Sequence, residues 1–301
     1  MKTALYSGKR KIILFAINFL LICLACFYTL FFSVKTASAM PFYDLKPEKL
    51  TTRASFYTSY SSSSEKRKHN IKLASKSINN TFVDVGGEFS FNLVVGERTE
   101  KRGYQTSKVI INGEFVDGVG GGICQVSTTL YNAVLLAGLE IVEYHPHSLP
   151  VSYVAPSFDA MVNSSSADLK FRNNTKNPII IRAYADDNMV KITVLGQKMS
   201  EKYERESIIL ESVPIPETQV VFDEKGDYPD IFKGEYKQIK FGKEGYISQG
   251  YLIKVEKGKR IKKRIRQDKY NATRGLIVYG NADKPIEQIP NDKELREILQ
   301  N

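Results

Sequence analysis

The sequence predicts an α+β protein, in which an α+β domain is followed by a small all-β module behind an N-terminal membrane anchor or signal. Three observations support this fold class. Residues 12–34 carry no charge, two segments between 65 and 138 repeat apolar residues at helical spacing, and short β-branched segments separated by turns follow residue 200. We divide the chain into a cytoplasmic tail with an anchor or signal (1–40), a serine-rich tether (41–64), an α+β domain (65–200), a β module (201–281) and a polar tail (282–301).

The uncharged stretch at residues 12–34 is long enough to cross a bilayer, which takes about 20 apolar residues. Four Lys or Arg residues precede it and a single lysine follows closely, which predicts a cytoplasmic N-terminus and an external remainder. Residues 37–39 have the small-x-small form of a signal-peptidase cleavage site, so a cleaved signal peptide is the alternative. We therefore expect a single-pass membrane protein with extracellular domains, or a protein secreted after cleavage near Ala39.

The charge distribution argues against nucleic acid as a partner. The net charge is +10, but residues 1–40 hold five of the 43 Lys and Arg residues and no acid, which leaves 38 basic against 33 acidic residues, or +5. This mild excess fits anionic cell-wall polymers or lipid headgroups, and equally a plain solvated surface. Nine basic residues between Lys254 and Lys269 predict one basic hairpin face, although lysines protecting an edge strand explain it as well.

The α+β domain is predicted element by element. Apolar residues at helical spacing predict a helix at 65–82, and β-branched and apolar runs predict strands at 89–95 and 104–116. Asn112-Gly113 between two β-branched runs is a strong signal for a two-residue hairpin turn. A second helix is expected from Cys124 to Gly138, where glycine favours a left-handed stop, and residues 140–144 follow as a strand.

Cys124 is the only cysteine beyond residue 26, so the external part has no partner for a disulfide. The glycine run at 120–122 leads from the predicted hairpin directly into the helix that Cys124 opens. A helix N-terminus favours thiolate over thiol, and backbone N–H groups of Gly121 and Gly122 would suit an oxyanion. Glycines also let a substrate carbonyl approach the backbone closely. A buried cysteine that acts only as a small hydrophobe is the alternative.

A nucleophilic thiol needs a base, and the sequence has three histidines. His69 lies in the charged start of the first helix and is expected to be solvated. His145 and His147 follow the strand that runs back towards Cys124; because a proline separates them, we expect only one to reach the sulfur, and we favour His147. Asp159 is the candidate that would orient the histidine, with a surface acid as the plain alternative. One Cys with a His-x-His is a weak zinc signal, so we expect no metal and no cofactor.

Three runs then resemble the VanW family: GGEFSFN at 86–92, GGGICQVSTTLYNA at 120–133 and HPHSLPVSY at 145–153. The resemblance spans roughly residues 54–197. The family is named from glycopeptide-resistance gene clusters, which implies a cell-wall protein of a Gram-positive bacterium. Some VanW domains are understood to be L,D-transpeptidases with a cysteine nucleophile, so the resemblance implies Cys124 as nucleophile and a histidine of 145–147 as its base. The candidates for oxyanion or substrate binding are Gly120, Gly121, Gly122, Gln125, Ser127 and Thr128.

The expected reaction is acyl transfer on peptidoglycan stem peptides. The thiolate would attack the amide after the third residue of a tetrapeptide stem, release the terminal D-alanine and pass the acyl group to the amine of a neighbouring stem. Water as the acceptor would make the protein a peptidase. Two alternatives stay open: a non-catalytic protein that binds peptidoglycan peptide and glycan, and an accessory to glycopeptide resistance that needs no thiol chemistry.

The C-terminal part is predicted to be all β. Strands are expected at 207–211, 218–222, 250–256 and 276–280, with a turn at Lys257-Gly258-Lys259. Their order resembles the G-five module of extracellular proteins over about residues 205–281. That family is linked with the binding of amino sugars, which implies a wall-targeting role.

Overall fold

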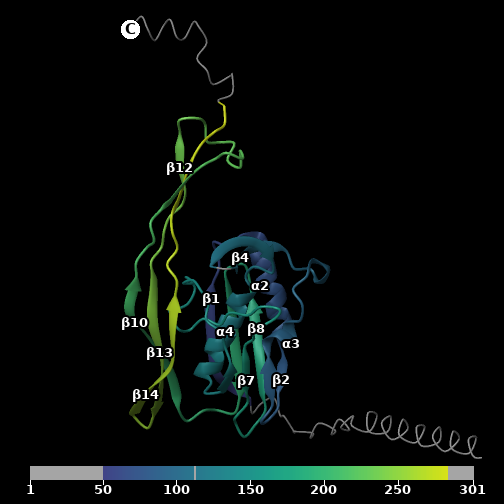
Figure 1. Cartoon of the computed structure of the whole chain (residues 1–301). Coiled ribbons are helices and arrows are strands. Elements are labelled where there is room, and N and C mark those ends of the chain that lie inside the picture. Colours follow the sequence, from purple (N-terminus) through teal and green to yellow (C-terminus); the bar gives the residue numbers. More distant parts are fainter. Residues whose placement is uncertain (1–49, 112, 284–301) are drawn as a thin grey trace, which may run out of the picture. The chain divides into compact units, whose positions relative to one another are not determined.

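The structure is a computed structural model that describes residues 50–111 and 113–283 (Figure 1). The expected anchor or signal at 12–34 and nearly all of the polar tail lie outside the described residues. Within the described part, no helix is both long and apolar enough to cross a membrane.

A four-stranded antiparallel sheet and two helices form the main core. The sheet has the order β1 (Thr51–Ser59), β9 (Met189–Gly196), β8 (Ile179–Ala185), β2 (Thr81–Val83). Helices α2 (Glu65–Ile78) and α4 (Ile123–Leu136) pack against it. Alternate residues of β9, Val190, Ile192 and Val194, are fully buried, as a strand with one covered face requires. This layer of helices on a sheet agrees with the predicted α+β class.

The predicted tether is wrong for residues 51–64. Residues 51–59 form β1, which pairs along its whole length with β9, and Tyr60 is buried in the core. Composition misled here, because serine and threonine are also compatible with a strand when alternate residues such as Phe56 and Thr58 face inward. Ser64, the last residue of the serine run, caps α2 by accepting from the backbone N–H of Arg67.

Two predicted elements end earlier or change type. Helix α2 ends at Ile78 and not at Phe82, because Asn80 takes a positive φ of 64° and the chain then enters β2. The stretch predicted as a strand at 89–95 is a short strand β3 (Glu88–Ser90) followed by the short helix α3 (Phe91–Val95). Ser90 starts this helix, since its side chain accepts from the N–H of Leu93.

The elements around Cys124 are confirmed. Strands β4 (Thr106–Ile111) and β5 (Glu114–Val119) form the hairpin, with Ile111 opposite Glu114 across the predicted turn. Helix α4 follows, Gly138 beyond its end takes a φ of 70°, and β6 (Glu140–Glu143) comes next. Strand β6 joins β7 (Lys170–Arg172) and β3 in a small sheet of order β3-β7-β6.

The C-terminal strands form two three-stranded sheets. Strands β10 (Lys202–Val213), β13 (Gly245–Glu256) and β14 (Lys259–Tyr270) are antiparallel, while β15 (Leu276–Tyr279) lies between β11 (Gln219–Phe222) and β12 (Tyr236–Lys240). The predicted turn is confirmed, with positive φ at Lys257 and Gly258.

The β module is continuous with the rest of the described chain. All described residues belong to one compact unit, and Leu252 of β13 and Ile265 of β14 pack against the core cluster. Strand β14 is at the edge of its sheet, and its first half, residues 259–264, is exposed and basic. Its second half differs, because Arg266, Asp268 and Tyr270 are buried.

Candidate active site

Cys124 is the second residue of α4 and is partly exposed. The glycine run before it is shaped by packing: Gly122 caps the helix at a φ of 109° and Gly120 has a φ of 89°, both in the region that favours glycine. A Cβ on Gly121 would lie 2.6 Å from the Lys108 carbonyl oxygen of β4. The run therefore lets the start of α4 sit directly on the hairpin.

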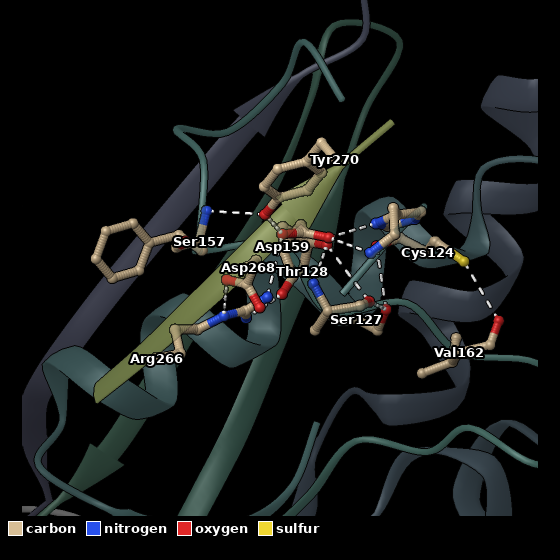
Figure 2. A network of polar contacts seen from close by, with 12 residues as sticks. Cys124, Ser127, Thr128, Ser157, Asp159, Val162, Arg266, Asp268 and Tyr270 are labelled. Atoms are coloured by element: carbon tan, nitrogen blue, oxygen red, sulfur yellow. Dashed lines mark hydrogen bonds and ion pairs between the residues drawn. The ribbon is translucent and has the colours of Figure 1, made fainter. Parts of the chain in front are cut away.

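His147 and Asp159 meet beside this cysteine. The carboxylate oxygen Oδ2 of Asp159 accepts from the backbone N–H of His147 at 2.6 Å and lies 2.7 Å from its Nδ1. Both side chains are buried, at 5% and 1% exposure for the two residues. With Nδ1 held by the carboxylate, Nε2 is the nitrogen left for the thiol. Figure 2 shows the network around Asp159 and Cys124.

The thiol and the imidazole influence each other strongly. Burial would raise the pKa of Cys124, but the hydrogen bond and charge of His147, with further help from the charge of Arg98, lower that pKa below its usual value. Burial would lower the pKa of His147, but hydrogen bonds to Asp159 and Cys124 raise it to about 9. Both shifts favour a thiolate beside an imidazolium. In the thiol form, Sγ donates to the Val162 carbonyl at 3.3 Å.

The second oxygen of the Asp159 carboxylate is held by strand β14. Oδ1 accepts from the Tyr270 hydroxyl at 2.5 Å and lies 3.4 Å from Nη2 of Arg266, whose Nη1 donates to the Asp159 backbone carbonyl at 2.6 Å. Burial would raise the pKa of Asp159, but the hydrogen bond and charge of His147 and the charge of Arg266 lower it. The carboxylate therefore stays ionised although it is buried.

His145, the other histidine candidate, is directed elsewhere. Its Nε2 lies 3.0 Å from Oε1 of Glu143, and its backbone carbonyl accepts from the N–H of Met161. Of the two histidines, the structure therefore brings His147 to the sulfur and places His145 against Glu143, and the catalytic role of either imidazole stays a prediction.

Gln125, Ser127 and Thr128 are engaged in internal hydrogen bonds. All three are fully or almost fully buried, because α4 is covered on nearly every side. The Gln125 amide donates to Ser59 at 2.8 Å, and Ser127 donates to the Ala160 carbonyl at 2.6 Å. Thr128 accepts from the Ala160 N–H at 2.9 Å. Their role is to hold β1 and the segment that carries Asp159 against α4.

The glycine run retains free donors. Among the described residues, the N–H groups of Gly121, Gly122 and Cys124 have no hydrogen-bond acceptor, whereas the N–H of Gly120 donates to the Gln105 carbonyl at 3.1 Å. Unpaired N–H groups at a helix N-terminus are the donors that an oxyanion requires. That role stays a prediction for Gly121 and Gly122, while Gly120 does not supply a free donor.

Two arginines flank the glycine run and were not foreseen from the sequence. A Cβ on Gly122 would lie 2.9 Å from Nη1 of Arg67, and one on Gly120 would lie 3.2 Å from Cβ of Arg98. Burial lowers the pKa of both guanidinium groups, and the charge of Cys124 opposes this in each. Their side-chain hydrogen bonds among the described residues go to the neutral amides of Gln125 and Asn92, and the charge of Asp168 also acts on Arg98.

Sequence reasoning also missed Arg266 and Tyr270. A signal was present in the alternation of β14, where Arg266, Asp268 and Tyr270 share one face and Gln267 and Lys269 share the other. The basic composition of the run concealed it. Within residues 50–111 and 113–283, no group of three His, Cys, Asp or Glu residues is arranged to hold a metal ion.

The fold and site define an α+β protein in which a thiol, an imidazole and a buried carboxylate lie in series at a helix N-terminus. Residues 66–195 match the family model described as VanW like protein. Residues 66–195 thus form a domain that is similar to the VanW family, and this domain contains Cys124, His147 and Asp159.

Two curated relatives are similar to the chain over part of its length. The uncharacterized protein YoaR of Bacillus subtilis (strain 168) is 48% identical over 128 residues, which are 42% of this chain and 42% of that protein. The vancomycin B-type resistance protein VanW of Enterococcus faecalis (strain ATCC 700802 / V583) is 29% identical over 143 residues, which are 46% of this chain and 50% of that protein. The chain thus spans half the length of these relatives or less.

Two solved structures are also similar to part of the chain. The IgA1 protease G5 domain has 14% identity and a TM-score of 0.18, over 28% of this chain and 92% of that chain. The HP0197 G5 structure has 17% identity and a TM-score of 0.14, over 27% of this chain and 100% of that chain. Likeness at these TM-scores supports no inference, so wall targeting by the β module stays a prediction.

Proposed function

We propose that this protein acts on bacterial peptidoglycan outside the cell, anchored through residues 12–34 or secreted, as a cysteine-dependent acyltransferase of the L,D-transpeptidase type. The observation that carries the proposal is the contact between the buried Asp159 carboxylate and Nδ1 of His147 at 2.7 Å, with the thiol of Cys124 beside the same imidazole. A nucleophile, a base and a group that orients the base are the three parts that acyl transfer needs.

In the first half of the reaction, the thiolate attacks the carbonyl carbon after the third residue of a stem tetrapeptide. The backbone N–H groups of Gly121 and Gly122 are the candidates to stabilise the oxyanion that forms. The His147 imidazolium gives its proton to the departing nitrogen, the amide bond breaks and D-alanine leaves as a neutral amine. A thioester on Cys124 remains.

In the second half, the amine of a neighbouring stem attacks the thioester. The neutral imidazole of His147 takes the proton from that amine, the new amide bond forms, and the thiolate is released. The pair returns to its starting state with one amide broken and one amide made. Water in place of the amine would release a free tripeptide stem and make the protein a peptidase.

The charges near the thiol fit a substrate that carries carboxylates. The thiolate and imidazolium balance each other, and Arg67 and Arg98 add positive charge beside them. Neither arginine forms an ion pair among the described residues, although the charge of Asp168 acts on Arg98. Partly buried guanidinium groups favour a bound anion. The terminal D-alanine of a stem tetrapeptide has a free carboxylate near the bond to be cleaved.

A role without catalysis is the second candidate. The Enterococcus relative is named for vancomycin B-type resistance, and it is 29% identical to this chain over half its own length. An accessory to glycopeptide resistance, or a protein that only binds peptidoglycan, would make no demand on the thiol of Cys124. The two candidates therefore differ in what a cysteine substitution does.

The test incubates the full-length chain with disaccharide-tetrapeptide muropeptides and follows the products by mass spectrometry. We expect cross-linked dimers, or loss of D-alanine, with the wild type and no product with Cys124→Ala or His147→Ala. His145→Ala is the matched control, because that imidazole contacts Glu143 instead of the thiol, and it should keep the activity.

The pattern among the variants decides between the candidates. Equal binding of muropeptides by the wild type and Cys124→Ala, without turnover by either, would exclude the acyltransferase and favour the binding role. Turnover that survives in Cys124→Ala would exclude cysteine chemistry.

A further inference from the structure

We propose that Tyr270 and Arg266 of strand β14 are positioning residues of the active site, so that the β module completes the site of the VanW domain. Their proposed task is to fix the carboxylate of Asp159, which in turn fixes His147. The inference rests on the proposed function for the chemistry that the site performs, but its geometry and its test involve no substrate.

The two oxygens of the Asp159 carboxylate have separate partners. Oδ2 accepts a hydrogen bond from the backbone N–H of His147 at 2.6 Å and lies 2.7 Å from Nδ1 of the same residue. Oδ1 accepts a hydrogen bond from the hydroxyl of Tyr270 in β14 at 2.5 Å. Arg266 adds a bond to the backbone carbonyl of the same aspartate at 2.6 Å. Figure 2 shows Tyr270 and Arg266 on the side of Asp159 that faces away from Cys124. The orientation of the carboxylate is therefore set from both sides.

Arg266 is itself rigidly held. Its side chain has no exposed surface, its Nε donates to Asp268 at 2.6 Å, and its guanidinium lies over the rings of Tyr144 and Tyr131 at 4.5 and 5.6 Å. Neighbouring groups outweigh burial and raise the pKa of this arginine. A buried cation between two carboxylates and two aromatic rings has little freedom to move, so it is a firm support for Asp159.

The backbone that leads to Asp159 is also shaped by the β module. Ser157 has a φ of 60°, which is strained for serine and needs support from its surroundings. That support comes from the Tyr270 hydroxyl, which accepts from the Ser157 N–H at 2.8 Å, and from Ser248 of β13 at 2.8 Å. A Cβ on Gly250 of β13 would lie 2.7 Å from the Ser157 carbonyl oxygen, so glycine is needed for this close approach. One tyrosine hydroxyl thus holds both Ser157 and Asp159.

Removal of the Tyr270 hydroxyl has a defined consequence. Nη2 of Arg266 is 3.4 Å from Oδ1 of Asp159, which is longer than a good charged hydrogen bond. Without the hydroxyl, we expect the Asp159 carboxylate to turn towards the Arg266 guanidinium, because two hydrogen bonds between an arginine and a carboxylate are more favourable than one long contact. This turn draws Oδ2 away from His147. The imidazolium then loses its support, and the thiol pKa rises.

Other titratable groups around the thiol stay in place in such a variant. Arg98 follows α3, Arg67 lies on α2 and Tyr153 lies in the connection after His147, and each interacts with the charge of Cys124. None of them contacts Tyr270 through a hydrogen bond or ion pair among the described residues. A change in thiol pKa on substitution of Tyr270 therefore reports on Asp159 and His147.

The test measures the alkylation rate of Cys124 by iodoacetamide as a function of pH in the full-length chain. Mass spectrometry of the peptide that contains Cys124 separates its signal from those of Cys23 and Cys26. We expect Tyr270→Phe to raise the apparent thiol pKa and to slow alkylation near pH 7 by about tenfold, the usual scale for losing one hydrogen bond to a charged group. Arg266→Lys keeps the positive charge but loses the two guanidinium nitrogens that contact Asp159, and it should also raise the apparent thiol pKa.

Tyr251→Phe is the matched control, because this tyrosine of β13 loses a hydroxyl bonded to Gln249 and does not touch Asp159. It should leave the pH profile unchanged. A thiol pKa in Tyr270→Phe that equals or falls below the wild-type value would overturn the proposal. If the melting curve shows that Tyr270→Phe does not fold, the pH profile of Cys124 alkylation in Arg266→Lys takes its place. A thiol pKa equal to or below the wild-type value in that variant would then overturn the proposal. Absence of muropeptide turnover would count against the proposed function alone, since alkylation needs no substrate.

Discussion

The substitution Asp159→Asn tests the charge relationship at the centre of the site. The aspartate accepts hydrogen bonds on both oxygens, from His147 on one side and from Tyr270 and Arg266 on the other. An amide of the same shape has only one accepting oxygen, so its NH2 group must face donors on one of the two sides. The imidazolium also loses the negative charge that supports it.

The size of the effect follows from the pKa of His147. A rise from 6.5 to about 9 corresponds to about 3 kcal/mol at about 1.36 kcal/mol per pKa unit. Cys124 supplies part of this, so we assign about 2 kcal/mol to Asp159, in line with hydrogen bonds to charged groups. Because the pKa is raised by folding, this stabilisation is fully present below pH 6.5 and is lost as the pH rises through about 9.

Urea unfolding of the wild type and Asp159→Asn at pH 6 and pH 10 measures this directly. We expect the variant to lose about 2 kcal/mol more at pH 6 than at pH 10, where the imidazole is neutral in both proteins. The exposed Asp187, which pairs with Lys72, provides the control, and Asp187→Asn should show no such dependence. An equal loss for Asp159→Asn at both pH values would refute the idea that Asp159 supports a charged His147.

Three further predictions concern the same site. The acylation rate should fall above about pH 9, as the His147 imidazolium deprotonates, and again at low pH as Cys124 is protonated below its lowered pKa, which a pH–rate profile checks. Arg98→Met should raise the thiol pKa and slow alkylation several-fold at pH 7 by removing a charge that favours the thiolate, and an unchanged rate would exclude that role. Gly250→Ala should lower the melting temperature and slow alkylation, because its Cβ would press on the Ser157 carbonyl; a melting curve like that of the wild type would contradict this close approach.

The part of the site that is local in sequence was predictable. A glycine run opening into apolar helical spacing placed Cys124 at a helix start, and the strand that follows the helix brought His147 back towards it. The proline between the two histidines was a sound reason to expect only one of them at the sulfur, since His145 contacts Glu143.

What was missed depends on contacts between distant parts of the chain. Nothing in the local pattern of residues 51–59 distinguishes a polar tether from a strand whose Thr58 bonds to Thr129 of α4. Gln125, Ser127 and Thr128 were candidates for substrate binding from the sequence, but α4 is buried and its polar groups satisfy backbone atoms of neighbouring segments.

The contacts between Asp159 and β14 have a consequence for folding order. Arg266 and Tyr270 reach Asp159 across 107 and 111 residues of chain, so these bonds form only after nearly all of the described sequence has been synthesised and brought together. Until then the Asp159 carboxylate lacks the partners that β14 supplies, so it does not yet hold His147 as it does in the folded protein. We therefore expect the thiol of Cys124 to reach its lowest pKa only late in folding, which a comparison of alkylation rates during refolding would check.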